Sequence, residues 1–264
     1  MNGSNAALTA RIAGVGFWAR GLPDWASACA YAHRGALVEP APQKPSPQLL
    51  PANERRRAPE TVAVALEVAL AACQAAQRDP ALLPGVFAST HGDLAITDYM
   101  AATLAEDPRA ISPTRFHNSV HNAAAGYWTI GAGCMAPATA LSAYDATFAE
   151  GLLEALLQLH AGAPAVLLVA YDGNAPGPLQ AISGTHGLLG GALLLSRDNA
   201  AGMHLRASLE DGEAAAGSGP LARHAAGNAM APMLPLFDAL AASAPLALLA
   251  AGPGRRLRLE LTDE

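Results

Sequence analysis

Residues 112–151 read SPTRFHNSVHNAAAGYWTIGAGCMAPATALSAYDATFAEG, and no other stretch says as much about the architecture. Its small residues and glycines follow the order of strand, tight turn and helix that is typical of an enzyme's nucleophile elbow. The tip of that turn, residues 143–146, reads AYDA and contains neither serine nor cysteine. The stretch therefore has the frame of an active site but lacks a nucleophile.

The composition around this stretch is that of a globular protein. Of 264 residues, 52% are hydrophobic and 14% charged, which is enough to bury one large core. The net charge is −6, and the basic clusters NERRR and GRRLRLEL are short, so we expect no nucleic-acid partner. No window reaches the roughly 18 apolar residues of a membrane span, and the N-terminus lacks a secretory pattern. We expect a cytoplasmic protein with no membrane partner.

The cysteines indicate reduced thiols. Cys29, Cys73 and Cys134 are odd in number, widely spaced and outside any CxxC pattern. This spacing argues against both a disulfide framework and a zinc site. We expect neither a metal nor another cofactor.

Strand and helix signals alternate along the chain. Residues 58–79 give the clearest helix, and the continuous apolar run at 163–172 predicts a buried strand. Residues 187–198 and 203–211 read as an adjacent pair of strands, and the proline-rich segment 37–58 as an exposed loop. Such alternation predicts an α/β fold with a mostly parallel sheet covered on both faces.

Motifs follow one another in a recognisable order. SP at 112–113 opens the stretch, NAAAG follows at 122–126, and Asp145 stands eight residues after Pro137. Upstream lie RIAGVGFWARG and VFASTHGD, and downstream GTHGLLGGALLLSR. Together they resemble the N-terminal half of the β-ketoacyl synthases, the thiolase-fold condensing enzymes of fatty-acid and polyketide synthesis, over roughly residues 11–197.

The resemblance implies a thiolase-like α/β fold with a mostly parallel, five-stranded sheet covered by helices. Residues 1–197 would form one half of the ketosynthase fold, with the proline-rich loop at 37–58. Residues 198–264 would form a reduced C-terminal extension packed on the same core.

The resemblance also implies a protein without catalysis of its own. Condensing enzymes need a thiolate at a helix N-terminus and two further groups, usually histidines. Here the nucleophile position is Asp145, and the family's GTGT motif is absent. The sequence is similar to the cysteine-lacking chain length factors of aryl-polyene and xanthomonadin-type pathways, which shape the acyl pocket of a catalytic ketosynthase.

The partners implied are therefore a β-ketoacyl synthase with an intact cysteine, as a heterodimer, and an acyl carrier protein. A homodimer is expected when the chain is expressed alone. The residues that reach the partner's acyl pocket lie, by position, just before and at the asparagine of NxxAG. They are Asn118, Ser119, Val120, His121 and Asn122. In an apolar tunnel such side chains set chain length by steric blocking.

Two other functions stay open. One is a stand-alone acyl-thioester enzyme, either a condensing enzyme or a hydrolase, that uses Cys134 or Asp145 with a histidine. The other is a homodimeric module that binds a carrier protein.

Three further groups of residues resemble a metal site, a hydrolase triad and a dinucleotide-binding loop, but each is explained more simply by structure. His117 and His121 have the i, i+4 spacing of a helical metal site, but poor helix formers surround them and HExxH is missing. Ser89, His91 and Asp93 contain the residue types of a hydrolase triad without GxSxG. The glycines at 187, 190 and 191 lack the GxGxxG order and indicate close backbone packing.

One further match concerns the second half of the family. RHAAGNAMAP, residues 223–232, resembles the family's GHxxGAAG only through His224 and Gly227. Two matching residues in an alanine-rich chain are weak support for a catalytic histidine.

Overall fold

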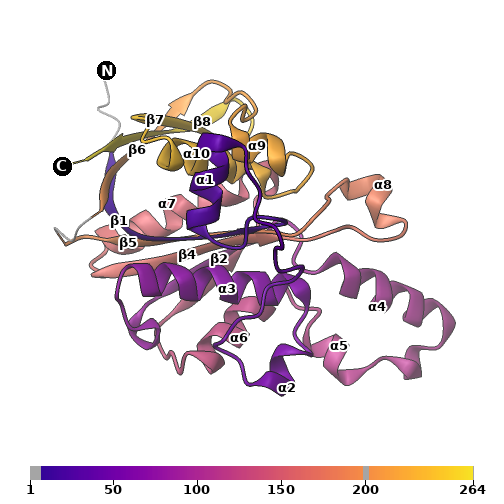
Figure 1. Ribbon diagram of the computed structural model, residues 1–264. Helices are drawn as coiled ribbons and strands as arrows, with labels where there is room; N and C mark the ends of the chain where they lie inside the picture. The colour runs from indigo at the N-terminus through magenta and orange to yellow at the C-terminus, as the bar shows by residue number, and fades with distance from the viewer. Residues whose placement is uncertain (1–6, 199–201, 264) are drawn as a thin grey trace.

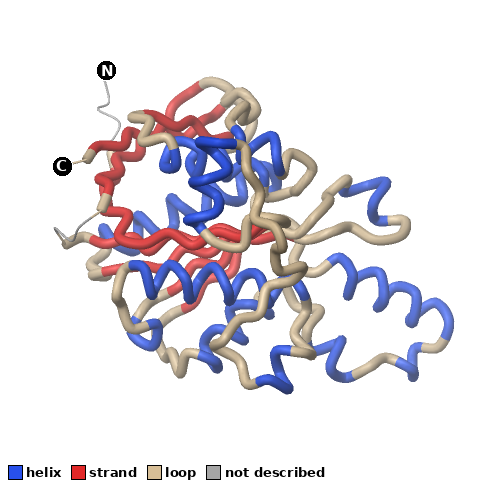
Figure 2. The backbone as a smooth tube through the Cα atoms, in the orientation of Figure 1, coloured by secondary structure: helices blue, strands red, loops and turns tan. Residues whose placement is uncertain are grey.

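Within residues 7–198 and 202–263, which the computed structural model describes, eight strands form one sheet (Figures 1 and 2). In chain order they are β1 (Leu8–Ala19), β2 (Gly85–Ala88), β3 (Ala138–Leu141), β4 (Ala165–Asp172), β5 (Leu189–Ser196), β6 (Met203–Asp211), β7 (Leu246–Ala250) and β8 (Arg255–Thr262). Their order across the sheet is β3-β2-β4-β5-β1-β6-β8-β7. Strand β2 pairs in parallel with β3 and β4, and the pairs from β4 onward are antiparallel.

Helices cover both faces of the sheet (Figure 1). The longer ones are α1 (Trp25–Arg34), α3 (Glu60–Ala75), α4 (Leu94–Glu106), α6 (Ala123–Gly131), α7 (Thr147–His160) and α10 (Leu234–Ala241). Short helices and 3-10 turns connect them: α2 (Ala52–Arg55), α5 (Pro113–His117), α8 (Leu179–Ser183), α9 (Pro220–His224), η1 (Pro80–Leu82), η2 (Pro108–Ala110), η3 (Tyr144–Ala146) and η4 (Ala231–Met233). None of the helices described is long and apolar enough to cross a bilayer.

Helix α3 lies directly on the middle of the sheet. Most of its residues are fully buried, as its apolar sequence predicts, and Pro59 precedes its first turn. The helix approaches β1 so closely that a Cβ atom on Gly16 would lie 2.0 Å from the carbonyl oxygen of Val68. This helix–sheet contact therefore requires a glycine at position 16 of β1.

Strand β1 joins the two parts of the sheet. Its residues from Arg11 to Ala19 pair with β5, whereas those from Leu8 to Ile12 pair with β6. Beyond β1 the sheet curls, so that β6, β7 and β8 lie over α1 and α10 while β4 and β5 lie beneath them (Figure 1). Helices are thus enclosed between two stretches of one sheet.

A single apolar cluster fills this enclosed layer. It contains Ile12 of β1, Leu152 of α7, Leu205 of β6, Phe237 of α10 and Leu257 of β8. A second cluster, on the other face, is built from α3, α6 and the inward side chains of β4 and β5. The segment after residue 198 shares the first cluster with the strands that precede it, and a domain boundary at 197 stays a prediction.

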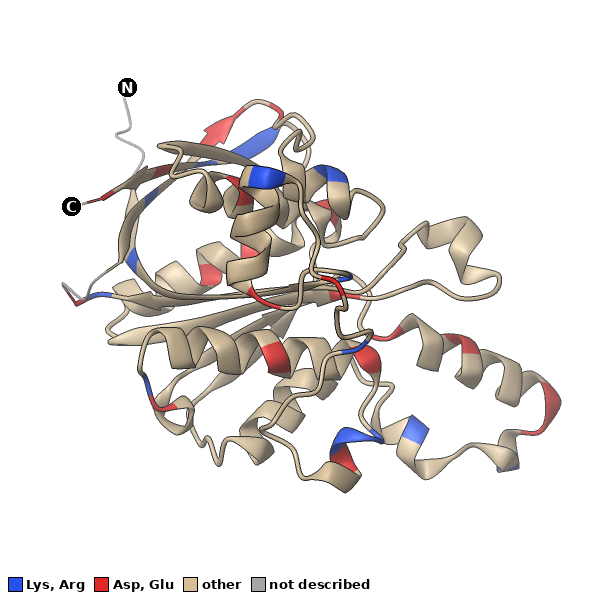
Figure 3. Cartoon of the chain, in the orientation of Figure 1, with Lys and Arg blue, Asp and Glu red and all other residues tan. Residues whose placement is uncertain are grey.

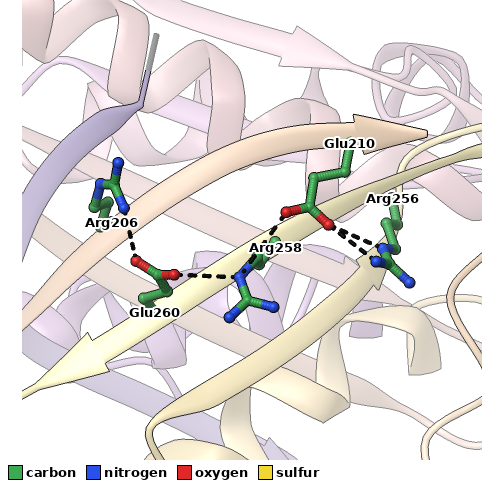
Figure 4. A network of polar contacts seen from close by, with 5 residues as sticks. All are labelled: Arg206, Glu210, Arg256, Arg258 and Glu260. Atoms are coloured by element: carbon green, nitrogen blue, oxygen red, sulfur yellow. Dashed lines mark hydrogen bonds and ion pairs between the residues drawn. The ribbon is translucent and has the colours of Figure 1, made fainter. Parts of the chain in front are cut away.

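The outward face of β6 and β8 carries charges (Figure 4). Arg206 Nη1 lies 2.9 Å from Glu260 Oε2, and Arg256 Nη2 lies 3.0 Å from Glu210 Oε2. Arg258 joins the two pairs, with its Nε 3.2 Å from Glu260 Oε1 and 3.9 Å from Glu210 Oε1. Each such pair at a surface contributes less than about 1 kcal/mol. Their effect is to make this face polar, so no apolar surface there requires a further layer of helices.

The sheet differs from the expected one in two respects. It is mixed and eight-stranded, because β5 returns antiparallel to β4 and β1 is antiparallel to β5; the prediction of a mostly parallel, five-stranded sheet was wrong. The strands predicted at 187–198 and 203–211 exist as β5 and β6, but β1 lies between them. The helix predicted at 58–79 and the buried strand at 163–172 are confirmed as α3 and β4.

The proline-rich segment 37–58 is a loop apart from the single turn of α2, as predicted. Most of it is exposed, but Leu50 is buried and packs near Gly131 of α6. The loop is thus held against the helical layer rather than extended into solvent.

The contact between α3 and β1 gives a stability test. Gly16→Ala places a methyl group against the backbone of Val68 and is expected to lower the free energy of unfolding by about 2 kcal/mol or more. Gly126→Ala in α6 is the matched control, because a Cβ there meets no atom within 4 Å and alanine favours a helix. Urea denaturation of both variants measures the difference, and equal midpoints would contradict the proposed close contact.

Candidate functional site

The turn between β3 and α7 is closed by a buried threonine. Thr147 Oγ1 accepts the N–H of Ala143 at 3.0 Å and donates to the carbonyl of Tyr144 at 2.6 Å. Tyr144 has φ +56°, a left-handed conformation that is uncommon for a residue with a bulky side chain. Its ring is exposed, so the residue presented at the tip of the elbow is Tyr144, with Asp145 following it.

A buried aspartate holds the loop beside the elbow. Asp172 ends β4 and is fully buried. Its carboxylate accepts the Ser89 hydroxyl at 2.9 Å, the Thr90 N–H at 2.9 Å and the His91 N–H at 3.2 Å. Burial raises the pKa of Asp172, although the three donors act in the opposite direction. This carboxylate fixes the loop that follows β2.

The same loop connects two other segments. Ser142, in the elbow, donates its hydroxyl to the carbonyl of Thr90 at 3.0 Å. His121 Nε2 lies 2.8 Å from the carbonyl oxygen of Ser89. The loop after β2, the segment 118–122 and the elbow are therefore parts of one hydrogen-bonded site.

A cavity of about 410 Å³ opens beside the elbow, and we call it the elbow cavity. Asp145 lines it together with alanines of residues 214–216 and 226–231, Pro232 and Leu248. Asp145 is exposed and is the only ionisable side chain among the described residues that line the cavity. The site thus offers small apolar walls and a carboxylate.

The lining of the elbow cavity can be compared with the groups that thioester chemistry needs. Acyl transfer requires an activated thiolate or hydroxyl with a base in hydrogen-bond reach, and donors aimed at the developing oxyanion. In the described part of the chain, neither cysteine nor histidine lines the elbow cavity. The described lining of the elbow cavity thus supplies a carboxylate but no thiol or imidazole.

The five residues assigned to the acyl pocket differ in their exposure to solvent. Asn118 is 3% exposed, and its Oδ1 atom is buried without a hydrogen-bond partner in the described structure. His121 is half-buried by its bond to the loop after β2. Ser119, Val120 and Asn122 are exposed, and with a side chain that is 51% exposed Val120 is the large apolar residue of the set.

The histidine pair does not share a helix face. Helix α5 ends at His117, whose ring packs edge-on against Tyr127 with centroids 6.4 Å apart, and His121 lies beyond the helix. The described residues contain no group of three or more His, Cys, Asp or Glu side chains that could hold a metal ion.

The other candidate residues make hydrogen bonds that stabilise the fold. Ser89 donates to Asp172, and Asp93 caps α4 through the N–H of Ile96 while accepting the Thr61 hydroxyl. Cys134 is buried after α6, with its Sγ 3.4 Å from the carbonyl oxygen of Leu83, and does not line the elbow cavity.

The structure also locates the glycines near residue 190 and His224, which the sequence analysis had singled out. Gly190 and Gly191 pack closely, as predicted, since a Cβ would lie 2.7 Å from Val64 and 2.6 Å from Phe237 respectively. For Gly187 the prediction was wrong, because a Cβ there would meet no atom within 4 Å; its φ of +73° is what favours glycine. His224 Nε2 lies 2.8 Å from the carbonyl oxygen of Arg20, and the residue lines a different cavity of about 890 Å³. It therefore does not face the elbow.

Sequence reasoning missed three residues that build the site: Thr147, Asp172 and Asn228. Asn228 Nδ2 lies 3.2 Å from the carbonyl oxygen of Asp172 and ties β4 to the C-terminal segment. A signal existed for Asp172, since an aspartate that ends a wholly apolar strand is seldom buried without a partner. The other two are polar residues whose role depends on contacts remote in sequence.

The architecture defines the class first: this is a thiolase-like α/β protein with a strand–turn–helix elbow whose turn holds Tyr144 and Asp145. A family model described as the N-terminal domain of beta-ketoacyl synthases matches residues 25–248. The chain therefore belongs to the β-ketoacyl synthase family, as its motifs predicted. Among curated proteins, no sequence matches it.

Solved structures share this fold. One chain of the complex between the ketosynthase ApeO and its chain length factor ApeC from Xenorhabdus doucetiae superposes with a TM-score of 0.76 at 23% identity, covering 96% of this chain and 99% of that one. The ishigamide ketosynthase/chain length factor gives 0.71 at 15%, covering 96% and 99%. A beta-ketoacyl synthase from Burkholderia phymatum gives 0.57 at 13%, with 88% of this chain covered and 71% of the other. The thiolase-like fold is thereby confirmed.

The loop after β2 gives a test of the site. Asp172→Ala removes an acceptor shared by three buried donors and is expected to lower the free energy of unfolding by about 2 to 4 kcal/mol. Asp145→Ala is the matched control, because that carboxylate is exposed, and a change within about 0.5 kcal/mol is expected. Urea denaturation checks both, and a neutral Asp172→Ala would mean that the loop does not depend on this carboxylate.

Proposed function

We propose that this chain is a non-catalytic, ketosynthase-like subunit of the chain-length-factor type. It pairs with an active β-ketoacyl synthase that retains its cysteine and shapes the acyl pocket of that partner in fatty-acid, polyketide or polyene-type synthesis. The observation that carries the proposal is the uncovered, almost charge-free edge of the sheet at β3.

Strand β3 is the terminal strand on its side of the sheet and pairs only with β2 among the described residues. Monomeric proteins protect such edges with charged residues, proline or a covering element. Between residues 110 and 149, the only residues of the types Lys, Arg, Asp and Glu are Arg115 and Asp145. An edge with so little protection supports pairing with another subunit.

Large apolar side chains are exposed on the segments that precede and follow β3 in the sequence. They are Phe116, Val120, Ile130, Met135, Tyr144 and Leu157. Met135 precedes the strand and is 95% exposed, and Ile130 on the neighbouring helix α6 is 78% exposed. We call these six residues the β3 patch. Exposed apolar side chains on the segments that flank an open edge strand are typical of protein interfaces.

The occupant we assign to the β3 patch is a ketosynthase subunit. The supporting facts are the family membership of the chain and the fold it shares with chains from ketosynthase–chain length factor complexes. It spans 99% of the matched chain in both complexes, against 71% of the Burkholderia phymatum ketosynthase. This chain is therefore close in length to a chain found in each of these ketosynthase–chain length factor complexes.

Within the patch, Val120 is the residue we assign to the acyl pocket. It is exposed beside the loop that the buried aspartate holds, whereas Asn118 is buried inside this chain. Ser119, His121 and Asn122 would support the position of Val120 at the interface. Contact with an acyl carrier protein is part of the proposal, since a complex of AntDE with the acyl-carrier protein AntF shares the fold with a TM-score of 0.75 at 13% identity.

A charge in the β3 patch tests the pairing. Ile130→Asp is expected to abolish the one-to-one complex with a co-expressed ketosynthase, because a carboxylate would be buried without a partner in an apolar interface. Ile182→Asp is the matched control, since Ile182 of α8 is 83% exposed and lies outside the patch. Light scattering on size-exclusion runs distinguishes the two. A complex that survives Ile130→Asp would exclude this surface.

Chain length in the product tests the pocket. Val120→Trp is expected to shorten the acyl chain made by the complex, because the larger side chain fills space at the end of an apolar tunnel, and Val120→Ala to lengthen it. Leu104→Trp on α4 serves as control for an exposed apolar residue outside the patch. Mass spectrometry of the products measures the distribution, and an unchanged distribution from an intact complex would refute the assignment.

A further inference from the structure

A third cavity opens at the start of helix α3, and we call it the α3 cavity. It measures about 590 Å³, within the range of about 300–1,000 Å³ that is typical of small-molecule sites. Its walls come from the first turn of α3, the start of α4, helix α5 with the residue that follows it, and the loop after β4. Segments far apart in the sequence thus enclose one volume.

Asn118 carries an unused hydrogen-bond acceptor at the wall of this cavity. The residue lines the cavity and is 3% exposed, and its Oδ1 atom is buried without a hydrogen-bond partner in the described structure. A buried polar atom that is left unpaired costs free energy, so this oxygen requires a donor that its neighbours in the chain do not supply. A ligand with an N–H or O–H group would supply it.

Asp93 places a second acceptor beside the first. Asp93 and Asn118 both line the α3 cavity and also, with Thr61, an internal void of about 10 Å³, so the two side chains face the same small volume. The Asp93 carboxylate accepts the Thr61 hydroxyl at 2.7 Å and the Ile96 N–H at 2.9 Å. A carboxylate has about four lone-pair sites, so it can accept further donors. Asp98, further along α4, lies outside the lining. The inner end of the cavity is therefore suited to an ammonium group.

Donors lie in the exposed part of the cavity. Arg57 and Arg115 line it and are exposed. Within the described structure the Arg57 side chain makes no hydrogen bond or ion pair, and Cζ of Arg115 lies 4.0 Å from the centroid of the Tyr99 ring. Helix α3 begins after Pro59 without a side-chain cap, so N–H groups of its first turn have no acceptor within the helix. These groups together attract a carboxylate.

The charges of the lining balance. Its two arginines are matched by two carboxylates, those of Asp93 and Glu60, and Lys44 binds Glu60 with Nζ 2.5 Å from Oε1. His121 lines only the inner void, and its Nε2 donates to the carbonyl of Ser89 at 2.8 Å. A ligand with one charge would be repelled by the groups of like sign, whereas a ligand with both charges finds a partner for each.

We propose that the α3 cavity binds an α-amino acid with an apolar side chain. Its ammonium group donates to Asn118 Oδ1 and to the Asp93 carboxylate, and its carboxylate accepts hydrogen bonds from the first turn of α3 and from the two arginines. The apolar side chain packs against Ile96 and Leu188, which also line the cavity. No residue of this lining belongs to the β3 patch, so the proposal does not rest on the pairing with a ketosynthase.

Calorimetric titration of the full chain with L-leucine tests this assignment. The two comparison probes are 4-methylpentanoate, which lacks only the ammonium group of leucine, and 3-methylbutylamine, which lacks only the carboxylate. Saturable binding of L-leucine is expected. Each probe should bind about tenfold more weakly or less, because each has lost charge-assisted hydrogen bonds.

Variants separate recognition from folding. Asn118→Leu should weaken L-leucine binding about tenfold, while the urea midpoint stays the same or rises because an unpaired buried oxygen is removed. Arg57→Gln should weaken binding about threefold to fivefold, since the guanidinium is exposed. Arg56→Gln is the matched control, because Arg56 is equally exposed, lies outside the lining and should leave binding unchanged.

Several outcomes would overturn the proposal. One is the absence of saturable L-leucine binding by the wild-type chain. Another is equal binding of either probe, because one charge of the ligand would then play no part. A lowered midpoint in Asn118→Leu would make that residue structural, and equal weakening by Arg56→Gln and Arg57→Gln would reduce the effect to general charge. If Asn118→Leu does not fold, the probes and the two arginine variants still decide the matter.

Discussion

The fold depends on one strand that belongs to two sets of pairings. Strand β1 bonds to β5 over most of its length and to β6 near its beginning, and helix α3 lies against its glycines. Without this strand, the segment after residue 202 would have no edge on which to pair, and the layer of α7 and α10 would be covered on one side only. The C-terminal segment is therefore integral to the core that surrounds the site.

The elbow shows that turn geometry and nucleophilic chemistry are separable. Thr147 closes the turn and Asp172 holds the neighbouring loop, and neither needs a cysteine at the tip. A left-handed Tyr144 is a costly conformation that the surrounding hydrogen bonds maintain. The shape of the turn is therefore maintained by hydrogen bonds from its own neighbours.

Charged side chains are unevenly distributed over the protein (Figure 3). The outward face of β6 and β8 carries a chain of ion pairs among arginines and glutamates (Figure 4), whereas residues 110–149, which include β3, contain only Arg115 and Asp145 of the types Lys, Arg, Asp and Glu. Charge on a strand surface keeps it in water, and its absence on an edge invites association. This contrast distinguishes the surface that stays in solvent from the one we assign to a partner.

The sequence alone determined what depends on near neighbours: the buried helix α3, the buried strand β4, and the order of motifs that identifies the family. These follow from periodicity and spacing within short segments. Only the tertiary structure decided that β1 separates β5 from β6 and that Asp172 holds the loop after β2. Such contacts join residues far apart in sequence, and strand partners and register are chosen by the packing of whole faces, which no local pattern encodes.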